Sequence, residues 1–214
     1  MPLTLYHGSK GGLQGSISLT DRNRCSCDFG RGFYMGDEIH QPQTLICGAE
    51  NPVLYTMKFD LEDLKVYRFE PDENWAMFVA FNRGKLQTYR KYPFYGNFER
   101  IRRENDVIIG RIADDKIFGV LNMFFEGFVG ITALVESLSA LKIGNQYCAL
   151  TEKAFRKIEI LKTKKLTVHE CELLKVRKLR QAAHAEAMAH DICKRMRREG
   201  LGFHELIEKL KEEK

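Results

Sequence analysis

The 214-residue sequence lacks several signatures that would place it in a familiar class of protein. Its six cysteines include no Cys-x-x-Cys pair, so we expect reduced thiols and no bound metal. No segment has the basic, then apolar, then small-residue layout of a secretory signal, so we expect a cytoplasmic protein. The most apolar run, residues 117–135, is interrupted by Glu126 and is expected to form buried helices rather than a membrane span.

Two nucleotide-binding signatures are also missing. Residues 28–30 read Asp-Phe-Gly, but only 27 residues come before them, too few for the small lobe of a kinase. The glycines at 30, 32 and 36 do not have the G-x-G-x-x-G spacing of dinucleotide-binding folds. The sequence therefore excludes a protein kinase and a Rossmann domain.

The charge is unevenly distributed along the chain. Hydrophobic content of 44% and charged content of 29% are typical of a soluble globular protein. Residues 162–214 hold 14 Lys/Arg and 9 Asp/Glu, a net charge of +5, whereas residues 1–161 hold 20 of each. We therefore expect a domain over residues 1–161 and a basic helical extension over 162–214.

The extension contains good helix formers and no proline after residue 166. An apolar stripe is expected at helical spacing, and Gly200 and Gly202 should separate a second helix over 204–211. The basic face could bind nucleic acid or an acidic protein, or the helices could pack on the domain or form a homodimer. The residues of the expected stripe are Leu173, Val176, Leu179, Ala183 and Ala187.

The most distinctive stretch is residues 28–36, Asp-Phe-Gly-Arg-Gly-Phe-Tyr-Met-Gly. Its glycines permit a sharp turn and a close approach of the backbone to a ligand. The pattern predicts a strand entered from a tight turn, with Tyr34 at the mouth of a pocket. The alternative is a hairpin whose aromatic residues belong only to the core.

The first predicted strand, residues 3–9, alternates so that Leu3, Leu5 and His7 share one face. His7 could contact a ligand, or its hydrogen bonds could be satisfied in the core.

Asp37 is a plausible cap for a helix over 38–49. Residues 90–103 are rich in aromatic and basic side chains, which suggests a mobile loop over a cleft or a surface that contacts nucleic acid. Further strands are predicted at 53–59, 65–69, 106–113, 145–150 and 157–166, and further helices at 72–89, 115–126 and 131–141.

Taken in order, several segments resemble ADP-ribosyltransferases of the diphtheria-toxin and poly(ADP-ribose) polymerase type, most closely a small bacterial branch. The matching motifs are Tyr6-His7-Gly8-Ser9, the glycine-rich turn that leads into Tyr34, and Asn145-Gln146-Tyr147, with further similarity at 75–83 and 106–115. The resemblance covers about residues 3–161. It implies an α+β fold with split antiparallel β-sheets around an NAD cleft.

The resemblance also implies roles for individual residues. His7 would hydrogen-bond the adenosine-side ribose of NAD, the Gly8 backbone would pair with the nicotinamide carboxamide, and Tyr34 would stack on the nicotinamide ring. The implied catalytic residues are His7, Tyr34 and Gln146. The implied NAD-binding residues are His7, Gly8, Ser9, Gly32, Phe33 and Tyr34.

Gln146 departs from the family pattern, which usually has an acidic residue at this position. A neutral glutamine argues against polymer elongation and is compatible with a single transfer. Gln146→Glu is expected to raise NAD hydrolysis if the geometry is kept. Glu152 would lie roughly 20 Å along an extended strand, too far to supply the missing charge.

The resemblance therefore implies a bacterial mono-ADP-ribosyltransferase that consumes NAD and modifies an unknown protein, nucleic acid or small molecule. We expect it to act as the toxic member of a toxin–antitoxin or phage-defence pair, with an antitoxin or another acidic partner binding residues 162–214. The rival interpretation is a non-catalytic module of the same fold that binds NAD, ADP-ribose or a protein.

Overall fold

The computed structural model describes residues 1–18, 27–112, 115–140, 144–197 and 199–212, except for the side chains of 115–118. Its fold is α+β, as the sequence predicts. The described strands form one seven-stranded sheet in the order β4-β5-β6-β2-β1-β3-β7. The strands are β1 (Leu3–Ser9), β2 (Phe33–Gly36), β3 (Val53–Phe59), β4 (Val66–Arg68), β5 (Val107–Arg111), β6 (Asn145–Ala149) and β7 (Ile158–Lys165).

The expected split antiparallel sheets are corrected to one mixed sheet. Strand β4 pairs in parallel with β5, and every other neighbouring pair is antiparallel. Strands β1 and β2 join the two halves of the sheet, but their register contains only the pair Tyr6 and Gly36. By contrast, β1 pairs with β3 over all seven of its residues. The two halves of the sheet are therefore joined by pairing at only one end of the junction between β1 and β2.

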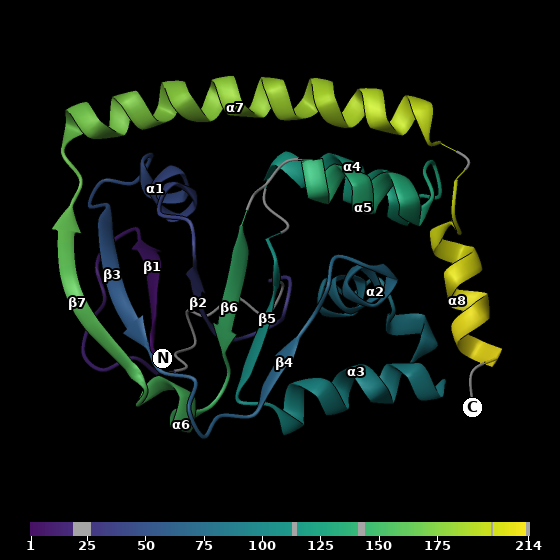
Figure 1. Ribbon diagram of the computed structural model, residues 1–214, viewed down its shortest axis with the longest axis horizontal. Helices are drawn as coiled ribbons and strands as arrows, with labels where there is room; N and C mark the ends of the chain where they lie inside the picture. The colour runs from purple at the N-terminus through teal and green to yellow at the C-terminus, as the bar shows by residue number, and fades with distance from the viewer. Residues whose placement is uncertain (19–26, 113–114, 141–143, 198, 213–214) are drawn as a thin grey trace.

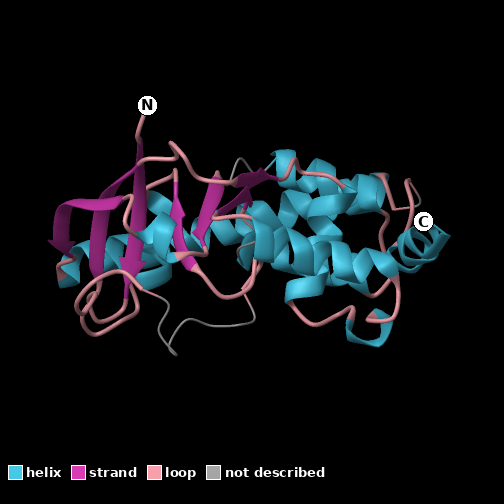
Figure 2. Ribbon diagram, turned by 90° about the horizontal axis from the view of Figure 1, so that it is seen from below, coloured by secondary structure: helices cyan, strands magenta, loops and turns pink. Residues whose placement is uncertain are grey.

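The helices gather mainly at one end of the molecule, and the strands gather at the other (Figures 1 and 2). Helix α7 runs along the whole length of this assembly, from β7 at one end to α8 at the other (Figure 1). The α-helices are α1 (His40–Ile46), α2 (Glu73–Asn82), α3 (Pro93–Glu104), α4 (Asp115–Phe125), α5 (Ile131–Ala140), α6 (Glu152–Phe155), α7 (Val168–Arg195) and α8 (Phe203–Glu212), and a 3-10 turn, η1, covers Gln87–Tyr89.

The largest core lies between the sheet and the helices. Trp75 and Phe78 of α2 are fully buried there, together with Ile108 of β5. The neighbouring residues Val107 and Ile109 pack into a second core on the opposite face of the sheet. Strand β5 is therefore covered on both faces, which explains its almost continuous apolar sequence.

The C-terminal helices pack on this same core. Phe203, Leu206 and Ile207 of α8 are buried in it, and Lys209 Nζ donates to Glu73 Oε1 of α2 at 2.7 Å. The predicted separation of two helices is confirmed, but the predicted apolar stripe faces outward. Leu179, for example, is 72% exposed. The buried face of α7 instead contains Cys171, Ala185, Ala189, Ile192 and Cys193.

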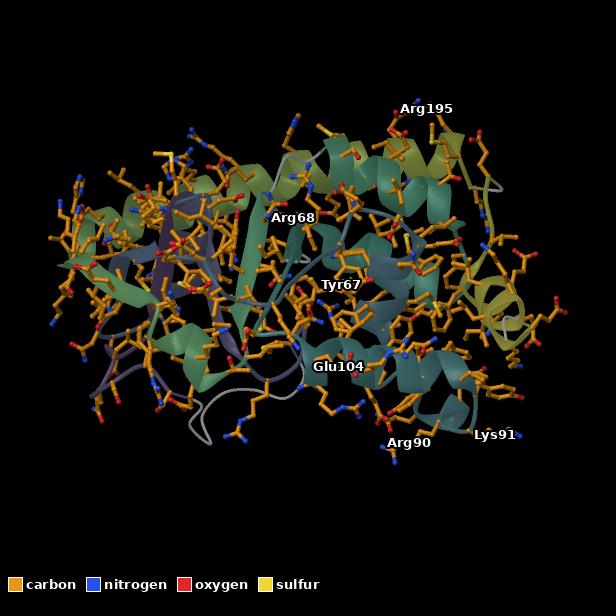
Figure 3. All side chains as sticks on the ribbon, turned by 60° about the horizontal axis from the view of Figure 1, so that its bottom comes forward. Tyr67, Arg68, Arg90, Lys91, Glu104 and Arg195 are labelled. Atoms are coloured by element: carbon orange, nitrogen blue, oxygen red, sulfur yellow. The ribbon has the colours of Figure 1, made fainter. Side chains whose placement is uncertain are left out.

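Two local predictions are wrong. Residues 93–104 form helix α3 rather than a mobile loop, because aromatic side chains at helical spacing, Phe94 and Phe98, enter the main core. Basic side chains lie at the surface beside them, including Arg90 and Lys91 in the turn before α3 (Figure 3). Asp37 does not cap α1, because its carboxylate accepts hydrogen bonds from the backbone and side-chain amides of Asn145.

Two other helix predictions are confirmed with shorter bounds. Asp72 caps α2 by accepting a hydrogen bond from Trp75 N at 3.0 Å, but the helix ends at Asn82 rather than near residue 89. The apolar run at 117–135 forms parts of α4 and α5, which are joined through a turn at Gly127. Among the described residues, no helix combines the length and the apolar character needed to cross a bilayer.

Candidate functional site

A cleft of about 1020 Å³ opens over strands β1 and β2. Its volume is at the upper end of the range of roughly 300–1,000 Å³ that is usual for small-molecule sites. The wall comes from β1 and the loop after it, from β2 and its preceding turn, and from α1. The end of α2 and the start of β6 contribute Arg83 and Gln146. The cleft therefore lies where β1 and β2 share their single register pair.

The structure brings the residues that the sequence singled out to this one cleft. Tyr34 and Gln146 lie on one face of the sheet, because Tyr34 is opposite Cys148, two residues from Gln146 along β6. His7 lies on the same face of the sheet as Leu5 of β1. It reaches the cleft from the β1 side of the junction between β1 and β2. The predicted residues that line the cleft are His7, Gly8, Ser9, Gly32, Phe33, Tyr34 and Gln146.

A tight turn orients Tyr34. Gly30 has a φ of +79°, a left-handed conformation that favours glycine, and its N–H donates to Cys27 O at 2.9 Å. The Tyr34 hydroxyl donates to Gly30 O at 2.6 Å and accepts from Phe29 N at 3.1 Å. Burial raises the pKa of the Tyr34 phenol well above its usual value, so the hydroxyl remains a donor. The hydroxyl fastens the turn, while the ring lines the cleft.

His7 is fixed by contacts on two sides. Its Nδ1 lies 2.7 Å from Tyr34 O, and since a carbonyl can only accept, Nδ1 carries the proton. The imidazole also stacks on Phe33, with ring centroids 4.4 Å apart. Burial lowers the pKa of His7, although the hydrogen bond to Tyr34 O partly opposes this effect. A neutral ring with its proton on Nδ1 leaves Nε2 as a hydrogen-bond acceptor.

Two glycines of the cleft allow parts of the protein to pack closely. A Cβ atom on Gly8 would lie 2.8 Å from Ile46 Cγ2 and from Pro42 O, so this glycine lets β1 approach α1. A Cβ atom on Gly32 would lie 2.3 Å from Cys148 Sγ, so that glycine lets the turn approach β6. The backbones of both glycines border the cleft. The fold requires glycine at both positions, because a side chain there would clash with its neighbours.

A hydrogen-bonded cluster that the sequence did not reveal lies beside Gln146. Asp28 Oδ1 accepts from Arg83 Nη2 at 2.6 Å and from Arg83 Nε at 3.1 Å. Asp28 Oδ2 accepts from Gln146 Nε2 at 2.9 Å. Asp28 and Arg83 both belong to segments with the family resemblance, but nothing in the sequence pairs Asp28 with Arg83, 55 positions away, or with Gln146, 118 positions away. Only the fold identifies these two charged residues as part of the site.

Other candidates lie elsewhere. Glu152 is exposed at the start of α6 and does not line the cleft, and the continuous strand on which its distance was predicted ends at Ala149. Asp114 and Cys25 lie outside the described residues. Within the described part of the chain, no three His, Cys, Asp or Glu side chains are grouped so that they could hold a metal ion.

The chain is thus an α+β protein with a cleft at the junction of its two half-sheets. It belongs to the family described as "Protein of unknown function (DUF3990)", whose model matches residues 3–160. No curated protein matches the sequence. The structure has a TM-score of 0.44 and 11% identity to a chain of "Crystal structure of the M.tuberculosis MbcT-MbcA toxin-antitoxin complex", covering 82% of this chain and 90% of that chain. A likeness this distant carries no functional argument, so function has to be argued from the cleft.

Proposed function

We propose that the protein is an NAD-dependent mono-ADP-ribosyltransferase, a pentosyl-transferring enzyme that uses NAD as co-substrate. The observation that carries the proposal is the convergence of His7, Tyr34 and Gln146 on one cleft, from three strands that are distant in sequence. The sequence resemblance to ADP-ribosyltransferases assigns catalytic roles to these same residues.

The polar atoms of the cleft suit a ribose. His7 Nε2 is an acceptor, because the proton lies on Nδ1. The amide nitrogen of Gln146 is used within the protein, which leaves its carbonyl oxygen as a second acceptor. Ribose hydroxyl groups can donate to both atoms. The ring of Tyr34 would supply a flat surface for the nicotinamide.

In the proposed reaction, the bond between the anomeric carbon of the ribose and the nicotinamide nitrogen breaks. The electron pair leaves with nicotinamide, and the sugar passes through an oxocarbenium-like state, as in glycoside hydrolysis. A nucleophilic atom of the acceptor then bonds to the anomeric carbon and loses its proton. Gln146 would hold the ribose hydroxyl while positive charge develops, an example of preorganised polar stabilisation.

The neutral side chain of Gln146 favours a second candidate function, a module that binds NAD or ADP-ribose without turnover. Both candidates use the same contacts to the nucleotide. They differ only in whether the bond to nicotinamide breaks.

Nicotinamide release separates these two functions. Purified protein is incubated with NAD, with and without a cell extract, while calorimetry measures NAD affinity. Nicotinamide release that is lost in Gln146→Ala supports the transferase, and mass spectrometry of the extract then identifies the acceptor. Binding without release supports the module. If wild type neither binds NAD nor releases nicotinamide, the transferase and the NAD-binding module are both rejected.

We also propose that the basic extension recruits an acidic partner, such as an antitoxin or a nucleic acid, to an effector of bacterial toxin–antitoxin or phage-defence type. The net charge of +5 in residues 162–214 supports this proposal. Lys175, Arg180 and Lys194 are exposed on α7, where such a partner could reach them.

A further inference from the structure

The orientation of the Gln146 side chain is determined by its partners. The amide nitrogen lies 2.9 Å from Asp28 Oδ2 and 3.1 Å from Arg111 O. A backbone carbonyl can only accept a hydrogen bond, and so can an ionised carboxylate. Both hydrogens of the amide are therefore engaged by these two acceptors, and the carbonyl oxygen is the atom that Gln146 can offer to a ligand.

Both partners of this amide are themselves held in position. Arg83 donates two hydrogen bonds to Asp28 Oδ1, a charge-assisted contact between side chains only 15% and 11% exposed. Arg111 O also accepts from Nε1 of Trp75, which is fully buried. Gln146 is thus fixed by a carboxylate on one side and by a carbonyl of β5 on the other.

We propose that Asp28 is a positioning residue for the ribose-binding carbonyl of Gln146, and that the negative charge of the site resides on Asp28 rather than on residue 146. This inference rests on the proposed function of the cleft. Asp28 acts through Gln146: its carboxylate holds the amide nitrogen, which directs the amide oxygen toward the ribose hydroxyl. Arg83 keeps Asp28 in place for this task.

The arrangement reverses one expectation from the sequence. Gln146→Glu would put a carboxylate oxygen in place of an N–H donor, against Asp28 Oδ2 and Arg111 O. Two carboxylates at that distance repel each other unless they share a proton. We therefore expect Gln146→Glu alone to lower turnover, because the geometry that the extra charge would require is not kept.

Exchanging the two side chains provides a matched test. Asp28→Asn, Gln146→Glu and the double variant that combines them form a cycle, and all four proteins have side chains of the same shape. The double variant keeps one carboxylate, one amide and Arg83 in the cluster, so the buried Arg83 still has an acid beside it. Each single variant alters that balance of charge.

For each protein, kcat and KM for nicotinamide release from NAD are measured. We expect each single variant to lower kcat by about tenfold to a hundredfold, the usual effect of losing a hydrogen bond to a charged group. The KM for NAD should change by less than about threefold. A defect that is only structural would instead change kcat and KM together, or would lower the melting temperature alone. In the double variant kcat should recover to within about fivefold of wild type.

Three outcomes overturn the proposal: a Gln146→Glu single variant as active as wild type, single-variant losses that simply multiply in the double variant, or losses that appear only in KM. If wild type binds NAD without turnover, the transferase is rejected, and the positioning of Gln146 by Asp28 is tested by the NMR measurement described below. If wild type does not bind NAD, the proposed function fails by itself. The Asp28–Gln146 contact is then tested by NMR, because Asp28→Asn must shift the Gln146 side-chain amide protons, and an unchanged signal rejects the contact.

Discussion

At the scale of single residues, two side chains of the cleft hold the backbone in place by hydrogen bonds and also line the cleft. The Tyr34 hydroxyl joins Phe29 N to Gly30 O across the glycine turn, while its ring lines the cleft. His7 Nδ1 binds the backbone of β2, and Nε2 is left for a ligand. Each side chain therefore contributes both to the shape of the site and to its chemistry.

The first prediction concerns the Tyr34 hydroxyl. Tyr34→Phe leaves Phe29 N and Gly30 O without their partner, and an unsatisfied buried group costs about 1–3 kcal/mol. We expect urea unfolding to show a loss of this size in the free energy of unfolding, with NAD affinity nearly normal in the folded protein. Tyr67→Phe is the control, because the hydroxyl of Tyr67 makes no hydrogen bond to any described residue. Equal stability of Tyr34→Phe and wild type would contradict the prediction.

The second prediction concerns the protonation of His7. Burial lowers the pKa of His7 below 6.5, so the ring is neutral at pH 7 and Nε2 can accept. Protonation turns Nε2 into a donor, so NAD affinity should fall about tenfold for each pH unit below the folded pKa. The contribution of His7 to stability has the same sign: it is fully present above pH 6.5 and is lost as the pH falls through the lowered pKa.

Calorimetry between pH 5 and 8 measures this dependence. The other ionisable side chains among the described residues that line the cleft are Tyr6, Lys10, Cys27, Asp28, Tyr34 and Arg83. His7→Asn provides the control, since its amide can replace the Nδ1 donor but has no group that titrates in this range. The variant should bind NAD weakly at every pH, and a pH dependence equal to that of wild type would exclude His7 as its source.

At the scale of the elements, the helical extension is part of the folded domain. Helix α8 contributes buried residues to the main core, and Lys211 lies 5.3 Å from the ring centroids of Tyr89 and Tyr92. Helix α7 buries one face and exposes the other, where Leu173, Val176 and Leu179 lie. Deletion of the extension would therefore remove part of the core as well as its charge.

The third prediction compares two leucines of the extension. Leu206 is 1% exposed in α8, so Leu206→Ala should lower the free energy of unfolding by about 2–5 kcal/mol. Leu179 is 72% exposed in α7, so Leu179→Ala should change it by no more than about 0.5 kcal/mol. Denaturant titration of both variants measures the difference. Similar values for the two would mean that α8 does not pack as described.

At the scale of the whole molecule, charge and chemistry lie on different elements. The net charge of +5 comes from residues 162–214, whereas every residue assigned to NAD lies between residues 7 and 146. Helix α7 nevertheless runs beside the sheet and the other helices along their full length (Figure 1). A partner bound to its outer face would sit on a helix that shares its hydrophobic cores with the rest of the fold.

The fourth prediction tests whether the exposed basic side chains bind a polyanion. Lys175, Arg180 and Lys194 are replaced together by glutamine, which leaves the buried face of α7 unchanged. If they contact phosphates, nucleic-acid affinity should fall, and the slope of log affinity against log salt should become less steep by about 2–3. Filter binding between 50 and 200 mM salt measures this slope. An unchanged slope, or retention that ignores salt in wild type, would reject a role for these three residues.

By itself the sequence determined the α+β class and six of the seven strands within a residue or two, while its resemblance to ADP-ribosyltransferases named part of the set of residues that lines the cleft. It could do so because alternation, helix caps and glycine-rich turns are local patterns that reflect short-range sterics and burial. Only the tertiary structure decided which apolar stripe of α7 is buried, that residues 93–104 are helical, and that Asp28 and Arg83 hold Gln146. These features depend on contacts between residues far apart in the chain, and a single sequence contains no record of which distant residues become neighbours.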